Sequence, residues 1–196
     1  KKYRVNTLKL LKYYLKCDKS SLNIVNKRLP SLIPYKDGIW KFEILLRITE
    51  YLSNQNNIIF KLCFCFFMFL YKKKSITYNV EIPLNCIREG LVIWHLNKII
   101  INSRVAIGRG ASISAGVTIG QKNQVIPVIG NFVVLTLDAK VLGANICDHV
   151  VIGSGAVQIK NIFEEYTSWA GVPSKLVSKN YPQSHLEREK RINKLH

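Results

Sequence analysis

Residues 107–120 read IGRGASISAGVTIG, and this stretch decides the fold of the chain. Its isoleucines stand six positions apart, at Ile107, Ile113 and Ile119, and the period reaches back to Ile101. An amphipathic helix would return an apolar residue every three or four positions, and a half-buried strand every two. A period of six instead indicates short strands joined by tight turns, with three strands in a coil of about eighteen residues.

The same pattern continues well beyond this stretch. An aliphatic residue is followed four positions later by a small or β-branched one in seven places: Ile101/Val105, Ile107/Ala111, Ile113/Val117, Ile129/Val133, Leu135/Ala139, Ile146/Val150 and Ile152/Ala156. Stacked coils place like residues above like and bury a continuous aliphatic column. The sequence therefore predicts a mainly β fold, a parallel β-helix over residues 76–178.

Residues 1–75 predict helices instead. Apolar residues recur at spacings of three and four from Trp40 to Leu52, flanked by Lys41, Glu43, Arg47 and Glu50, which indicates an amphipathic helix beginning after Asp37-Gly38. The next apolar run, residues 58–71, is about 14 residues long, short of the roughly 20 that span a bilayer. We expect a buried helix there, with an interfacial helix as the alternative, and a polar tail over residues 179–196.

The net charge of +17 is concentrated in the amino-terminal third, where residues 1–75 carry 16 basic and 4 acidic side chains. Such a region favours an anionic partner, either a membrane surface or an acidic polymer. No nucleic-acid-binding motif accompanies it, so we expect no nucleic-acid partner. The five cysteines show no zinc-ligand or redox spacing, and the first residues do not resemble a secretory signal. We therefore expect a cytoplasmic protein without a metal.

Several blocks of the sequence resemble the hexapeptide-repeat acyltransferases. Within that family they are most similar to the serine acetyltransferase branch, and especially to its capsular and exopolysaccharide O-acetyltransferases. The blocks are EIPLNCIREGLVIWHLNKIIIN (81–102), IGRGASISAGVTIG (107–120), PVIG (127–130), AKVLG (139–143), DHVVIGSGAV (148–157) and WAGVPSKLV (169–177). The resemblance implies a left-handed parallel β-helix with an α-helical amino-terminal region, assembled as a homotrimer. It also implies direct acetyl transfer from acetyl-CoA to a hydroxyl, in sites between neighbouring subunits.

By this resemblance His95, in GLVIWHLNKIIIN, matches the family's general base. An imidazole can take up a hydroxyl proton near neutral pH as the new bond forms. The family orients this base with an aspartate fifteen positions earlier, where this chain has Val80. The adjacent Glu81 is the expected partner, and a solvated strand-edge charge is the alternative reading of this residue. Asn102 is a second candidate for orienting His95 or a substrate hydroxyl.

The acceptor positions depart from the serine acetyltransferase pattern. A second aspartate and an Arg-His pair grip serine in that branch, and Trp94, Val125 and Ile126 stand at the matching positions. A buried zwitterion without charged partners is costly. Trp94 offers an aromatic platform for a sugar, or else packs on a coil face. We therefore expect a sugar hydroxyl of a capsular or other surface polysaccharide, or of its precursor, as the acceptor.

For acetyl-CoA, the resemblance implies a groove along the later coils. The matching residues are Gly120, Lys122, Ser154, Gly155, Ala170, Gly171 and Lys175. The basic amino-terminal third would suit peripheral contact with the inner face of the cytoplasmic membrane. Three alternatives stay open: a serine O-acetyltransferase of cysteine biosynthesis, N-acetyl transfer to an amino sugar, and a non-catalytic hexapeptide scaffold.

Overall fold

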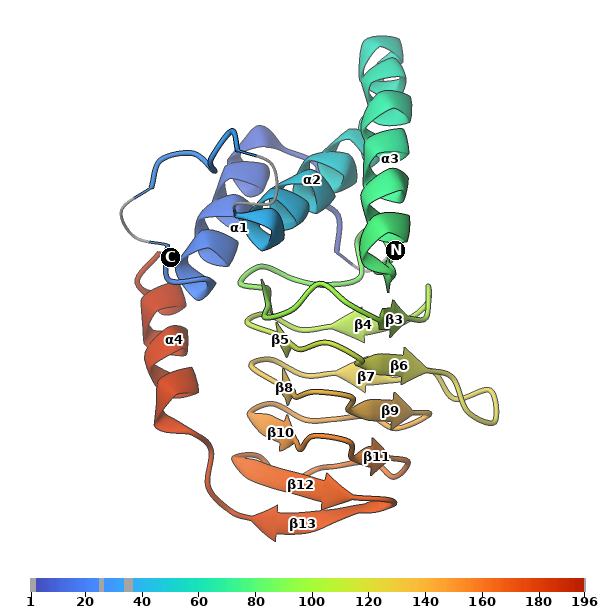
Figure 1. Ribbon diagram of the computed structural model, residues 1–196, viewed down its shortest axis with the longest axis vertical. Coiled ribbons are helices and arrows are strands. Elements are labelled where there is room, and N and C mark those ends of the chain that lie inside the picture. Colours follow the sequence, from blue (N-terminus) through green and yellow to red (C-terminus); the bar gives the residue numbers. More distant parts are fainter. Residues whose placement is uncertain (1–2, 25–26, 34–36, 196) are drawn as a thin grey trace.

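The computed structural model describes residues 3–24, 27–33 and 37–195, and it places a group of helices on one end of a stack of coils (Figure 1). The predicted parallel β-helix with an α-helical amino-terminal region is confirmed. The helices are α1 (Leu8–Ser21), α2 (Gly38–Ser53), α3 (Ile58–Tyr78) and α4 (Gln183–Asn193).

The coils have three faces, each built from short parallel strands. One sheet has the order β1-β3-β6-β9-β11, a second has β13-β12-β10-β8-β5-β2, and β4 pairs with β7 on the third face. Only β13 is antiparallel to its neighbour, so β12 and β13 end the stack as a hairpin. The strands are β1 (Val80–Glu81), β2 (Val92–Ile93), β3 (Ile99–Ile101), β4 (Ala106–Ile107), β5 (Ser112–Ile113), β6 (Thr118–Gly120), β7 (Val128–Ile129), β8 (Val134–Leu135), β9 (Lys140–Leu142), β10 (Val150–Ile152), β11 (Val157–Gln158), β12 (Thr167–Gly171) and β13 (Ser174–Ser178).

The isoleucines of the six-residue period line the inside of the coils. Ile101, Ile107, Ile113 and Ile119 are each at most 1 % exposed. In the parallel register Ile113 pairs with Ile93 in the preceding coil and with Leu135 in the following one. Like residues therefore stack into one aliphatic column, as the period predicts.

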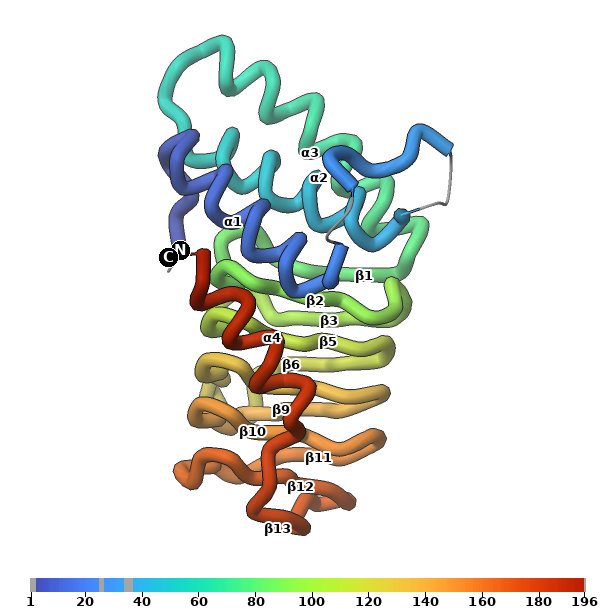
Figure 2. The backbone as a smooth tube through the Cα atoms, turned by 90° about the vertical axis from the view of Figure 1, so that its left-hand side faces the viewer, coloured from blue at the N-terminus to red at the C-terminus, as the bar shows by residue number. Residues whose placement is uncertain are grey.

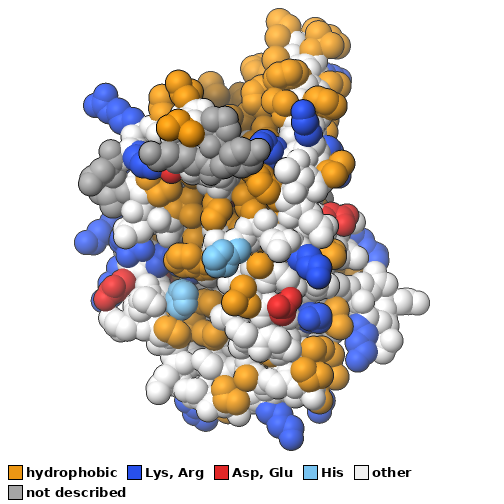
Figure 3. All heavy atoms as spheres, in the orientation of Figure 1, with side chains coloured by type: hydrophobic (Ala, Val, Ile, Leu, Met, Phe, Trp, Pro, Cys, Tyr) orange, Lys and Arg blue, Asp and Glu red, His pale blue; other side chains and the backbone are white. Residues whose placement is uncertain are grey.

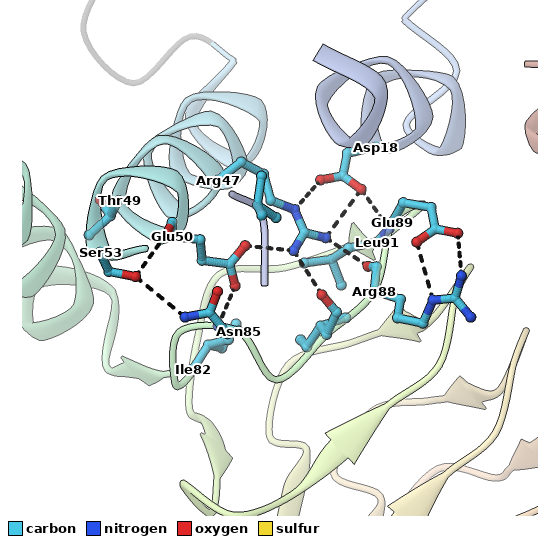
Figure 4. Close-up of polar contacts among 12 residues, drawn as sticks. Asp18, Arg47, Thr49, Glu50, Ser53, Ile82, Asn85, Arg88, Glu89 and Leu91 are labelled. Carbon is cyan, nitrogen blue, oxygen red and sulfur yellow. Dashed lines mark hydrogen bonds and ion pairs between the residues drawn. The ribbon is translucent and has the colours of Figure 1, made fainter. Parts of the chain in front are cut away.

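The first coil has no coil above it, and charged side chains of the helices take that place (Figure 4). Arg47 of α2 is fully buried and lies between two carboxylates, 2.7 Å from Asp18 and 2.9 Å from Glu50. The same guanidinium donates hydrogen bonds to the carbonyl oxygens of Ile87 and Arg88, at 2.9 and 2.8 Å. Burial raises the pKa of Asp18 and of Glu50, and the adjacent guanidinium works in the opposite direction.

The carboxylates accept hydrogen bonds from the backbone of the first coil. Asp18 accepts from the amides of Gly90 and Leu91, at 2.7 and 2.9 Å. Glu50 accepts from the amide of Asn85 at 2.7 Å. The backbone groups at a buried sheet edge need hydrogen-bond partners. In the first coil these side chains provide the partners that an additional coil would otherwise supply.

The polar face of α2 is therefore not a solvated face. Glu43, Arg47 and Glu50 are each at most 1 % exposed, although their spacing in the sequence is that of an ordinary hydrophilic helix face. Glu43 accepts a hydrogen bond from the amide of Ile93 at 3.0 Å. Burial, followed by the negative charge of Asp18, raises the pKa of Glu43 well above its usual range.

The expected burial of residues 58–71 is wrong for most of α3. Among them, only Tyr71 is buried, and Ile58, Leu62 and Phe66 are each more than half exposed. One stripe of the helix packs on α2 and the first coil, and no other described element covers the opposite stripe. The sequence showed that the run is apolar, but it could not show that only one side has a neighbour.

The carboxyl-terminal segment forms α4, which the sequence analysis did not predict. It turns back and runs along the solenoid toward the helices (Figure 2). Arg188 donates a hydrogen bond to the carbonyl of Gly110 at 2.7 Å, and Glu189 meets the imidazole of His149 at 3.0 Å. Ile192 is fully buried in a cluster with Cys17 of α1 and Phe132.

We expect Arg47→Met to lower the free energy of unfolding by about 3–5 kcal/mol, because it leaves two buried carboxylates without their counter-charge. Urea unfolding at neutral pH measures this loss. Lys179→Met is the matched control, since the Lys179–Glu164 pair is exposed. The control should lose less than about 1 kcal/mol. Equal losses in both variants would contradict the capping role of Arg47.

His185 on α4 should make an unfavourable contribution to the stability of the fold in mild acid. Burial, reinforced by the charge of Arg188, lowers the pKa of His185 to about 4. The unfolded imidazole titrates at about 6.5. Between these values the unfolded chain binds a proton on His185 that the folded chain does not, so the contribution of His185 to stability falls as the pH falls from 6.5 toward 4. The raised pKa of Glu43 contributes in the opposite direction. Urea midpoints across this range should fall less steeply in His185→Gln; parallel curves would contradict the assignment.

Candidate active site

His95 lies in the corner between β2 and β3, on the coil nearest the helices. Its side chain is exposed, whereas its backbone is fixed. The carbonyl of His95 accepts a hydrogen bond from the amide of Asn97 at 3.0 Å, and the carbonyl of Asn97 accepts one from Gly116 in the next coil. Lys98 closes the corner with a φ of 52°. The imidazole is thus presented to solvent from a turn that the next coil supports.

Trp94, beside His95, is anchored to the coil face. Its indole Nε1 donates a hydrogen bond to Ser112 Oγ at 2.8 Å, and its amide donates to the carbonyl of Ile113 at 3.0 Å. The side chain remains 48 % exposed. Part of the Trp94 side chain therefore packs on the coil face, and the rest faces solvent.

The corners of the following coils lie in line with that of His95 and carry hydroxyl side chains, with Leu137 and Asp138 beside them in the third coil. Ser114, Thr136 and Ser154 occupy the same corner in three successive coils, and Ser154 Oγ lies 3.3 Å from Thr136 Oγ1. Gly155 has a φ of 67°, and a Cβ built there would meet nothing within 4 Å. The edge is therefore open at Gly155, whereas Leu137 and Asp138 occupy the same corner in the coil before it. Ser114 and Thr136 were not among the predicted site residues, although the six-residue register of the sequence places them at this corner.

This line of corners ends at the hairpin of β12 and β13. A Cβ at Gly153 would approach Ala170 at 3.1 Å, so Ala170 lies directly below the corner of Ser154. Gly171 follows with a φ of 98°, and Lys175 of β13 pairs with Ala170. Five of the residues predicted to bind the donor therefore lie on the same edge of the solenoid as His95. They are Ser154, Gly155, Ala170, Gly171 and Lys175.

Gly120 and Lys122 lie on another edge of the prism. Gly120 is the last residue of β6, and Lys122 lies in the loop that joins β6 to β7, where it pairs with Val125 across a two-residue turn. This loop projects beyond the coils (Figure 1), and a Cβ at Gly143 would lie 2.7 Å from that of Lys122. Within one chain this loop comes after β6, whereas His95 comes before β3. The two therefore lie at opposite edges of the sheet that contains β3 and β6. A single chain therefore does not bring Lys122 to His95.

Glu81 and Asn102 have contacts of their own. Glu81 lines a cavity of about 400 Å³ between α3 and β3, together with Lys72 and Ile100, and His95 does not line it. Asn102 Oδ1 accepts a hydrogen bond from the amide of Arg104 at 3.0 Å and so stabilises its own turn. These contacts within one chain lend no support to either residue as the orienting group of His95, which stays a prediction.

The described part of the chain contains no group of three or more His, Cys, Asp or Glu side chains that could hold a metal ion. The chemistry available along this edge is that of an exposed imidazole and a series of hydroxyl and backbone groups. These can take up a proton and hold a long, flexible ligand against an open backbone.

No protein-family profile matches the chain, but individual proteins do. It is 31% identical over 140 residues to a serine acetyltransferase of Haemophilus influenzae, an alignment covering 68% of this chain and 50% of that protein. It is 30% identical over 133 residues to a serine acetyltransferase of Buchnera aphidicola, covering 63% of this chain and 50% of that one. The chain therefore spans about half the length of these relatives.

Solved structures agree on the fold. A serine acetyltransferase from Brucella abortus, determined in complex with coenzyme A, superposes with a TM-score of 0.68 at 18% sequence identity. The superposition covers 88% of this chain and 70% of the Brucella chain.

These relatives correct the expected acceptor. The expectation of a polysaccharide rested on the uncharged side chains at Trp94, Val125 and Ile126, but the similar proteins are serine acetyltransferases. The expectation was wrong because it treated three positions of one chain as the whole acceptor site. Trp94 is partly committed to Ser112, and Val125 lies in a loop on another edge, so neither defines a sugar platform.

Proposed function

We propose that this chain is an acetyl-CoA-dependent O-acetyltransferase that acts on the hydroxyl of serine, with His95 as the general base. The observation that carries the proposal is the position of the imidazole, which is exposed on the edge of the coils where Ser154 and the open backbone of Gly155 also lie. The similarity to two serine acetyltransferases supports the reaction and the acceptor.

In the proposed reaction His95 removes the proton of the serine hydroxyl as its oxygen attacks the thioester carbonyl. The tetrahedral intermediate collapses, the C–S bond breaks, and the imidazolium returns its proton to the leaving thiolate. The fixed backbone of the corner limits how far the imidazole can move, and such positioning contributes to the rate along with proton transfer. No acyl-enzyme is needed.

We place acetyl-CoA along the edge that descends from His95. Its pantetheine would follow the corners of Thr136 and Ser154, where the missing side chain at Gly155 leaves the backbone accessible. Lys175, which is exposed on β13, would meet the phosphates. Ala170 and Gly171 would border the groove.

We further propose a homotrimer, because the groups assigned to one site lie on two edges of the same chain. A second subunit packed beside the His95 edge would supply its projecting loop, with Lys122, to that site. Lys122 and Arg104 are the exposed cations at this loop, and Arg104 is hydrogen-bonded to Gln121. They are our candidates for the carboxylate of serine, in place of the Arg-His pair that Val125 and Ile126 replace.

Replacing His95 tests the reaction and the base together. Thioester loss from acetyl-CoA, followed by ultraviolet absorbance, should depend on serine and fall roughly 10²–10⁴-fold in His95→Ala. The absorbance assay avoids thiol reagents, which would react with the exposed Cys63 and Cys65. His185→Gln is the control and should retain activity. Thioester loss that is independent of serine, or unchanged in His95→Ala, would refute the proposal.

A bulky side chain on the His95 edge tests the donor groove. Ser154→Trp should raise the KM for acetyl-CoA roughly tenfold or more, because the indole would occupy the space that Gly155 leaves open. The KM for serine should change little. Glu187→Trp, at an exposed position of α4 on another edge, is the matched control. An unchanged KM for acetyl-CoA in Ser154→Trp would place the donor elsewhere.

A further inference from the structure

The two sides of α3 differ in their surroundings but not in their hydrophobicity. One stripe packs inward: the ring of Phe60 contacts Tyr51, Phe64 and Phe67 join the cluster between α1 and α2, and Tyr71 is buried. The opposite stripe follows the same helical spacing. It consists of Ile58, Leu62, Phe66, Phe69, Lys73 and Ile76, which we call the outer stripe of α3.

The outer stripe is exposed along its whole length. Leu62, Phe66 and Phe69 are 67%, 59% and 65% exposed, and Ile58 and Ile76 are 68% and 80% exposed. Figure 3 shows hydrophobic side chains gathered over the upper part of α3, where the helix stands clear of the body. Apart from Lys73 the stripe is apolar, and an apolar surface of this kind marks an interaction site more often than isolated exposed residues do.

Lysines border the outer stripe, and α3 contains no acidic residue. At 100° per residue Lys61 and Lys72 flank one side of the stripe and Lys74 the other. Lysine stems can lie along an apolar surface while their charges reach a polar layer. An apolar face bordered by lysines is the arrangement of a helix that lies in the interface of an anionic bilayer.

The charges argue against a second copy of the chain as the partner. An antiparallel pair of α3 helices centred on Phe66 would place Lys61 of one copy beside Lys72 of the other. A parallel pair would place Lys72, Lys73 and Lys74 against their own counterparts. Neither arrangement offers a carboxylate on α3 to neutralise them, whereas anionic lipid headgroups would do so.

We propose that the outer stripe of α3 docks on the surface of an anionic lipid bilayer. The proposal places α3 along the bilayer surface. Among the described residues no helix is long and apolar enough to cross a membrane. The stripe enters the boundary between headgroups and acyl chains, and Lys61, Lys72 and Lys74 meet the headgroup phosphates. This docking is independent of the acetyl transfer proposed above.

Vesicle sedimentation of the whole chain tests the docking. Binding to vesicles of phosphatidylglycerol and phosphatidylcholine should exceed binding to phosphatidylcholine alone by roughly tenfold or more, and should weaken as salt is added. The combined variant Leu62→Ser, Phe66→Ser and Phe69→Ser should lose most of this binding. The control, Leu176→Ser with Val177→Ser, removes exposed apolar residues of β13 and should bind like the unmodified chain.

A polarity-sensitive fluorophore on the exposed Cys65 of α3, in a Cys63→Ser and Cys147→Ser background, gives a second readout. Its emission should shift to shorter wavelength with anionic vesicles only, because the helix enters a less polar layer. The proposal is overturned if the chain does not bind, if it binds equally with the outer stripe replaced, or if the serine variants reduce the oligomer size without vesicles. The last result would make a second copy the occupant. Thioester assays on the same variants remain a separate test of activity.

Discussion

The fold depends on how the chain ends a stack of parallel strands. A solenoid pairs every coil with two neighbours, and the first coil lacks one of them. Its amides and carbonyls would be buried without partners if apolar helices simply covered them, at a cost of about 1–3 kcal/mol for each group. Arg47, with the carboxylates of Asp18 and Glu50, supplies both donors and acceptors to that edge. The helices can therefore lie on the coils.

The need for these hydrogen-bond partners explains why charged residues lie between the helices and the first coil. Replacing a buried ion pair with apolar residues is often neutral or stabilising in other proteins. Here the charges are also hydrogen-bond partners of the first coil, so an apolar substitute would leave the amides of Asn85, Gly90 and Leu91 without these partners. The opposite end needs no such cluster, because the β12–β13 hairpin ends the stack by changing strand direction. The two ends of the stack of coils are thus closed in different ways, one by charged side chains and the other by a hairpin.

Much of the solenoid could be predicted from the sequence, because its period belongs to no other regular structure. Ile101 to Ile119 set the register, and the structure retains it. The role of Arg47 could not be predicted, since a hydrophilic helix face has the same spacing whether it meets water or a strand edge. The exposure of Phe66 escaped prediction for a similar reason, because an apolar run does not reveal what covers it. His95 emerged only from the resemblance of its block, whereas the open edge below it needed the coordinates.

The path of α4 gives the chain a property that most solenoids lack. In a linear stack each repeat touches only its neighbours, and the terminal coils can unravel one at a time. Here the last helix returns to α1, where Ile192 packs with Cys17, so segments from the two ends of the sequence share one cluster. Unfolding of either α1 or α4 would open that contact. Folding must bring residues about 175 positions apart together, which favours a slower but more nearly all-or-none transition than an open array shows.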